Sequence, residues 1–135
     1  MLLKSPSGSL CPYYYMGGEL HPLKYGGFFK DKAKLFATIQ AEQEFILKSS
    51  GQNNRTIWID LYETNLDEEV IDALAEHIKA ISHKIFKICL VGCSWSKEQR
   101  IKKVFKKHNV DIVTQIMFFS DPEKAKQWLI GKNVL

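Results

Sequence analysis

Two short stretches of the chain hold residues whose types and spacing are suited to chemistry. The first, the turn Gly92–Ser96, contains a thiol, an indole and two hydroxyls, carried by Cys93, Trp95, Ser94 and Ser96. It is predicted to join a buried strand to a helix, whose exposed N–H groups and dipole favour an anion. The same helix end would lower the pKa of the Cys93 thiol and raise its reactivity. The turn is therefore a candidate site for a small anionic or apolar ligand.

The Gly92–Ser96 turn also has a simpler interpretation. Helix capping accounts for its serines, with Ser96 opening a capping box that ends at Gln99. Neither a Gly-x-Gly-x-x-Gly pattern nor a Walker lysine is present. Cys89 precedes Cys93 by four strand positions, so their Cα atoms would lie about 13 Å apart, too far for a disulfide. We predict no redox pair, and ligand binding and simple capping both stay open.

The second stretch is Thr64–Glu69, which carries a hydroxyl and three carboxylates, on Thr64, Asp67, Glu68 and Glu69. Asp60 and Asp67 flank one loop, and paired carboxylates can perform acid–base chemistry. Strand-end and helix-cap roles account for both, so catalysis is the less favoured interpretation. Thr64 or Asn65 is expected to cap the following helix, and the acids complement the positive end of its dipole.

The histidines and basic residues indicate neither a metal nor a nucleic acid. Ligand spacing such as His-x3-His is absent among His21, His77, His83 and His108, and no cysteine cluster supports them. His77 is instead expected near a helix C-terminus, where a cation is favourable. The basic stretch Lys97–His108 turns its apolar positions to the core, so its charges are interpreted as a solvated surface. We expect no cofactor, no metal site and no nucleic-acid partner.

The elements that position these residues alternate between strands and helices. Apolar runs predict strands at residues 57–61, 85–91 and 112–119, each followed by an amphipathic helix. An earlier helix from Asp31 to about Lys48 follows a hairpin formed by residues 13–16 and 19–24, with Gly17-Gly18 as its turn. Such alternation forms parallel βαβ units, whose functional surface lies at the carboxyl ends of the strands. The fold class is therefore α/β, with a mostly parallel central sheet, an N-terminal hairpin and about four helices.

Length and composition indicate one domain of ordinary globular type. The 135 residues carry a net charge of +4, which is mild. We expect a flexible leader at residues 1–11, one domain at 12–131 and a tail at 132–135. No apolar run is long enough to span a bilayer, and three cysteines form no disulfide framework, so we expect a cytoplasmic protein. The segment His21–Phe29 is either a flap over the sheet edge or a partner-binding patch.

The order of elements resembles the STAS fold of anti-sigma-factor antagonists. The resemblance rests on Trp58–Leu61 leading into Asp67–Leu74, and on Phe118–Leu129, which looks like the end of the divergent SpoIIAA-like branch. It extends over residues 13–131. It implies a non-enzymatic domain that binds partner proteins and accepts a phosphate on a Ser or Thr at the start of its second helix. In this chain that position reads Asp67-Glu68-Glu69, so the acceptor hydroxyl is missing and Thr64 is the nearest substitute.

The sequence thus predicts a regulatory or protein-interaction module of STAS-like type. Its protein partner is expected to contact Thr64, Asp67, Glu68 and Glu69. Glu68 either imitates a permanently phosphorylated acceptor or only complements the helix dipole. The alternative is a ligand-binding or enzymatic α/β domain that uses Gly92–Ser96. The identity of the partner or ligand and the oligomeric state stay open.

Overall fold

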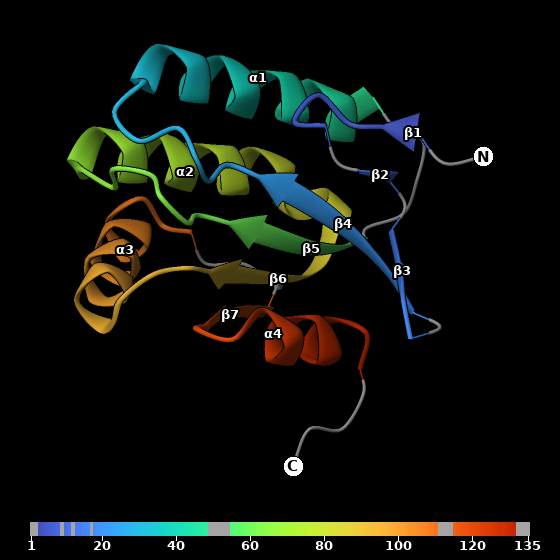
Figure 1. Ribbon diagram of the computed structural model, residues 1–135. Helices are drawn as coiled ribbons and strands as arrows, with labels where there is room; N and C mark the ends of the chain where they lie inside the picture. Colours follow the sequence, from blue (N-terminus) through green and yellow to red (C-terminus); the bar gives the residue numbers. More distant parts are fainter. Residues whose placement is uncertain are drawn as a thin grey trace.

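A five-stranded sheet forms the centre of the fold (Figure 1). The computed structural model describes residues 3–8, 10–11, 13–16, 18–48, 55–110 and 115–131. Across the sheet the strands follow the order β3 (Tyr13–Tyr15), β4 (Gly18–Lys24), β5 (Arg55–Asp60), β6 (Ile85–Val91) and β7 (Gln115–Phe119). β3 pairs antiparallel with β4, and the other neighbours in the sheet are parallel. The predicted hairpin and mostly parallel sheet are confirmed.

Four helices in the described residues cover the two faces of this sheet. They are α1 (Lys32–Lys48), α2 (Glu68–Ile81), α3 (Trp95–Lys107) and α4 (Pro122–Leu129), with a short 3-10 turn (Ser82–Lys84) after α2. The helices α1, α2 and α3 pack on one face, and α4 packs on the other (Figure 1). The predicted α/β class, with about four helices, is confirmed.

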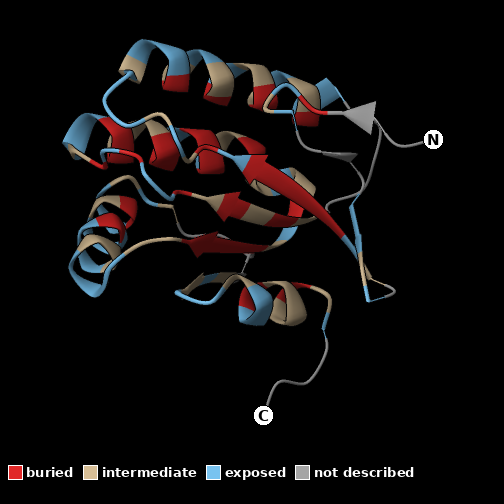
Figure 2. Ribbon diagram, in the orientation of Figure 1, coloured by how far each residue is buried: buried red, intermediate tan, exposed pale blue. Residues whose placement is uncertain are grey.

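Side-chain alternation along β6 divides the apolar core between the two faces. Ile88 and Leu90 pack with α1, α2 and α3, whereas Cys89 and Val91 pack with α4. This division arises because successive Cβ atoms of a strand point to opposite faces of the sheet. Figure 2 shows buried residues along β4, β5 and β6 and on the sides of α1 and α2 that face the sheet. The core therefore fixes the strands whose carboxyl ends carry the candidate site.

A second, two-stranded sheet lies at the N-terminus. It consists of β1 (Leu3–Lys4) and β2 (Leu10–Cys11), which pair antiparallel. Between them, the buried Ser5 hydroxyl donates a hydrogen bond of 2.9 Å to the Glu42 carboxylate of α1. The Ser7 N–H donates a second one, at 3.0 Å. The segment expected as a flexible leader thus contributes paired backbone and a cover over Glu42.

Some sequence predictions fall outside the described residues. These are Gly17 of the hairpin turn, the first part of the last strand at 112–114, the tail at 132–135, residues 1, 2 and 9 of the leader and residue 12 of the domain.

The starts of two helices differ from the sequence prediction. Helix α2 is capped by Asp67, which accepts a hydrogen bond of 3.0 Å from the Val70 N–H, so the predicted cap at Thr64 or Asn65 is wrong. The reason is that the backbone of residues 62–65 pairs with the loop at residues 27–29, so the helix begins only at Glu68. Helix α3 is capped by Ser94 and not by Ser96, and therefore begins at Trp95.

Candidate functional site at the carboxyl edge of the sheet

The loop after β4 and the loop after β5 run side by side beyond the ends of their strands. Backbone hydrogen bonds join Tyr25 N to Asp60 O (3.0 Å), Gly27 N to Tyr62 O (2.7 Å), Phe29 N to Glu63 O (2.9 Å) and Asn65 N to Phe29 O (2.9 Å). The β4 pairing with β5 therefore continues as an irregular ladder past the sheet. The segment Tyr25–Phe29, which sequence patterns did not explain, therefore pairs through its backbone with the loop between β5 and α2.

Tyr62 holds the neighbouring loops of this edge together. Its N–H donates to the Asp60 carboxylate at 2.9 Å, and its hydroxyl donates to the Ser120 carbonyl, after β7, at 3.1 Å. Its ring lies against Gly92, where a Cβ would stand 3.0 Å from the Tyr62 Cγ. One side chain thus spans from the loop after β5 to the loops after β6 and β7, and it fixes their relative positions.

Two residues that are neighbours in space at this edge have left-handed backbone conformations, which favour glycine. Phe29 has φ +53° and Glu63 has φ +55°, and the two are joined by the hydrogen bond from Phe29 N to Glu63 O. Such a conformation costs an ordinary residue about 1–2 kcal/mol, and it is uncommon for an aromatic residue. Strain of this kind gathers at binding and catalytic sites, where the surrounding structure maintains it. The ladder between the two loops provides that support.

Replacing Glu63 by glycine is expected to stabilise the protein by about 1 kcal/mol, since glycine adopts a left-handed conformation without steric cost. Glu63 is exposed, so little packing is lost with its side chain. Urea unfolding curves of wild type and E63G measure the gain. The variant E63A removes the same side chain but keeps the Cβ, so it should change stability by less than about 0.5 kcal/mol. Equal stability of the two variants would contradict strain at this position.

The four residues predicted to contact a partner have different environments. Thr64 is buried, and its hydroxyl donates to the Tyr25 carbonyl at 2.8 Å. Asp67 and Glu69 both bind the Lys32 ammonium, the latter at 3.0 Å, and the hydrogen bond from Lys32 holds the pKa of Asp67 below its usual value. Glu68 is exposed and has no ion pair within the described residues. Glu68 and Glu69 are both exposed, and Glu68 is the one of the two that forms no ion pair with a described residue.

A groove of about 500 Å³ lies beside Glu68, between α2 and α3. Ile71 and Val104 contribute apolar surface to it. Its basic residues are Arg100, Lys103 and Lys107, which share one face of α3 because residues three, four and seven apart are neighbours on a helix. In the part of the chain that the structure describes, these three cations form no ion pair. The start of α2 is therefore an acidic point at the border of a basic surface.

In the Gly92–Ser96 turn the two serine hydroxyls already form hydrogen bonds, whereas one aromatic ring is exposed. The Ser94 hydroxyl caps α3, and the Ser96 hydroxyl lies 3.3 Å from it. Burial raises the pKa of the Cys93 thiol to about 11, although Lys97 opposes this, so the thiol is protonated at neutral pH. The reactive Cys93 expected from the helix end is therefore not what the environment favours. The Trp95 side chain, in contrast, is 75% exposed.

A buried polar cluster behind the edge was not anticipated from the sequence. His77 is 1% exposed, and its Nε2 accepts a hydrogen bond of 2.6 Å from the Tyr25 hydroxyl. Its Nδ1 donates to the side-chain amide oxygen Oε1 of Gln43 at 3.1 Å. Burial lowers the pKa of His77 to about 4 against the weaker attraction of Glu42, so the imidazole is neutral at pH 7. The expectation that His77 acts as a helix-end cation is wrong.

Glu42 is the second buried ionisable group in this region. Its side chain is fully buried, and burial raises its pKa, but the His21 imidazole 4.0 Å away and hydrogen bonds from Ser7 and Ser5 outweigh this effect. The net result is a pKa below the ordinary value of a glutamate. Glu42 is therefore a carboxylate at neutral pH, held under the N-terminal sheet. The signal in the sequence was a glutamate on the apolar face of α1, at a position between Ile39 and Ile46.

Among the described residues, no group of three or more His, Cys, Asp or Glu side chains is placed to hold a metal ion. No helix in the same residues has the length and apolar character needed to cross a membrane. Comparison of the chain with protein-family models, with curated proteins and with solved structures found no significant match. Function is therefore inferred from the arrangement of the residues themselves.

Proposed function

We propose that this chain is a non-enzymatic, STAS-like interaction module that binds a partner protein through the carboxyl edge of its sheet. The observation that carries the proposal is a pair of large aromatic side chains exposed at this edge. Phe29 is 62% exposed after β4, and Trp95 is 75% exposed after β6. Exposed aromatic residues dominate binding energy in protein interfaces. The loop after β5 lies between the loops that carry these two residues, and it leads into the exposed Glu68 at the start of α2.

The rigidity of the edge supports the same proposal. Tyr62 ties the loops together, and the strained backbone at Phe29 and Glu63 is held by the ladder between the loops. A pre-ordered surface loses little conformational freedom on binding, which favours affinity. The groove beside Glu68 adds positive charge, from Arg100, Lys103 and Lys107, that can orient a partner.

In this proposal, partner binding is not switched by phosphorylation of Thr64. Its hydroxyl is buried and already donates to the Tyr25 carbonyl, so a kinase would have to open the ladder between two loops to reach it. Glu68, exposed at the first position of α2, supplies a permanent charge where the family resemblance implies a phosphate. We place the module in the cytoplasm, in keeping with the free thiols of Cys89 and Cys93.

The substitution Trp95→Ala is expected to lower capture of the partner at least about tenfold, because truncating an aromatic anchor costs about 1.4 kcal/mol or more. The measurement is quantitative affinity capture from a lysate of the source cells, with the immobilised chain at matched amounts. Phe86→Ala is the matched control, since Phe86 is 50% exposed at the opposite, amino-terminal end of β6. The control should capture as much partner as wild type.

Charge reversal at Glu68 tests the second part of the surface in the same assay. Glu68→Lys should reduce capture, whereas Glu44→Lys, an exposed glutamate on α1, should not. A partner captured equally by wild type, W95A and E68K would contradict binding at the carboxyl edge. Thermal unfolding of each variant verifies that reduced capture does not come from misfolding.

A further inference from the structure

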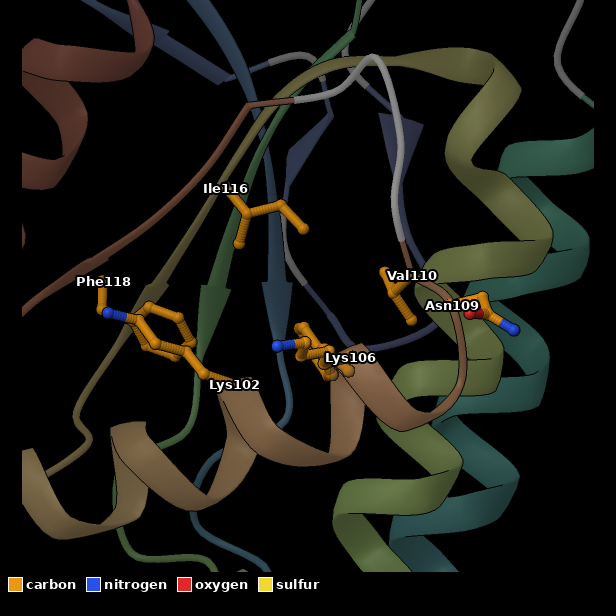
Figure 3. A pocket seen from close by; sticks show the side chains of 7 residues that line it. Lys102, Lys106, Asn109, Val110, Ile116 and Phe118 are labelled. Carbon is orange, nitrogen blue, oxygen red and sulfur yellow. The ribbon is translucent and has the colours of Figure 1, made fainter.

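A cavity of about 460 Å³ opens between α3 and the edge strand β7 (Figure 3). Its apolar lining consists of Phe105, Val110, Ile116 and Phe118. Its polar lining consists of Lys102, Lys106 and Asn109. Figure 3 shows Ile116 and Phe118 on the strand side and the two lysines on the helix opposite. Ligand sites in proteins have this combination of size, apolar walls and few polar groups.

The cavity exists because α3 covers the end of the core incompletely. Only Ile101 and Phe105 of this strongly basic helix are buried. Val110, Ile116 and Phe118 pack against the main core but remain partly exposed. A ligand that covers these side chains would remove apolar surface from water, which is favourable. The lining is therefore apolar surface at the edge of the sheet that α3 leaves partly exposed.

The charges around the cavity favour an anion. Lys102 is paired with Glu98 at 2.8 Å, and its ammonium lies 5.5 Å from the centre of the Phe118 ring. Lys106 forms no ion pair with any residue that the structure describes. No carboxylate is among the residues that line the cavity. One uncompensated ammonium, beside the amide of Asn109 and above an apolar floor, suits a single negative head group.

We propose that this cavity binds a small amphipathic carboxylate, with its head group at Lys106 and Asn109 and its apolar tail between Phe105, Ile116 and Phe118. A polyphosphate is not expected, because a single unpaired lysine provides few donors for several charges. None of the residues that line the cavity belongs to the Gly92–Ser96 turn or to the loops after β4 and β5. The proposal for this cavity therefore does not depend on whether the chain binds a partner through the carboxyl edge.

The first test compares ligands that differ in one property, titrated into the full-length chain by calorimetry and followed by thermal unfolding. Decanoate, below its micelle concentration, should bind and raise the melting temperature, because a ligand of the native state stabilises it. Butyrate keeps the head group without the tail, and decyltrimethylammonium keeps the tail with the opposite charge. Both should bind at least tenfold more weakly than decanoate. Absence of decanoate binding, or equal binding of decyltrimethylammonium, would overturn the proposal.

The second test locates the site with two charge reversals on the same helix. Lys106→Glu should weaken decanoate binding at least tenfold, whereas Lys103→Glu, which faces the α2–α3 groove, should leave it unchanged. Ile116→Trp, which fills the cavity, should abolish binding without removing any charge. Equal loss in both lysine variants would show general attraction of an anion to a basic helix and would refute a site at Lys106.

Discussion

Lowering the pH from 7 to 4 is expected to cost the folded protein about 3 kcal/mol of stability through His77 alone, given a folded pKa of about 4 against 6.5. In the unfolded chain the imidazole takes up a proton near pH 6.5, whereas burial delays protonation of the folded protein until about pH 4. Between these values the unfolded state binds more protons, so stability is complete above pH 6.5 and falls as the pH falls. Urea unfolding at a series of pH values measures this slope.

Two variants separate burial from hydrogen bonding as the cause of the slope. His77→Gln keeps an acceptor for the Tyr25 hydroxyl but does not titrate, so its stability should change less between pH 6.5 and 4 than that of wild type. Tyr25→Phe removes the hydrogen bond to Nε2 but keeps the ring buried, so the slope should persist. An unchanged slope in H77Q would refute the assignment to His77.

Other titrating groups act in distinguishable directions or pH ranges. Hydrogen bonds with Asp72, and secondarily with Glu76, raise the pKa of His108. Its contribution is therefore present below the unfolded pKa and is lost as the pH rises, opposite to that of His77. The pKa of Glu42 is lowered, so its contribution is lost only as the pH falls below the ordinary glutamate range. The window between pH 6.5 and 5 therefore reports mainly on the histidines, and H77Q isolates His77 within it.

Local patterns in the sequence were sufficient to predict most of the scaffold. Apolar residues recur at helical spacing along α2, and they are buried because this spacing places them on one face: Val70, Ile71, Leu74, Ile78 and Ile81. The start of α4 also has a local signal, because Asp121 caps the helix and Pro122 occupies its first turn. These signals depend on residues a few positions apart, so the three-dimensional neighbours of the segment do not change them.

The candidate site depended on contacts between distant segments, which such patterns do not contain. The cap of α2 moved from Thr64 to Asp67 because residues 62–65 pair with residues 25–29. The hydrogen-bond partners of the buried His77 are Tyr25, from the loop after β4, and Gln43, from α1. No local motif marks the left-handed backbone of Phe29 and Glu63. The sequence predicted that the candidate loops follow the carboxyl ends of the strands, as they do, but the contacts of their residues required the structure.

Gly92→Ala is expected to destabilise the protein by about 3 kcal/mol, which is a fall of about 10 °C in melting temperature for a chain of this size. Two effects add. At φ +97° a Cβ costs about 1–2 kcal/mol of backbone strain. The added Cβ would also stand 2.9 Å from the Tyr62 nitrogen and 3.0 Å from its Cγ, so the ring or the loop must move. Differential scanning calorimetry measures the loss.

Gly27→Ala separates these two effects. Gly27 has φ +87°, but a Cβ there would meet no atom within 4 Å, so only the backbone strain of about 1–2 kcal/mol is expected. The difference between the two variants is then the cost of displacing Tyr62. Because Tyr62 joins the loop after β5 to the loops after β6 and β7, that cost measures how firmly the carboxyl edge is held. Equal losses in the two variants would mean that Tyr62 moves freely, and a rigid surface presenting Trp95 would then have no physical basis.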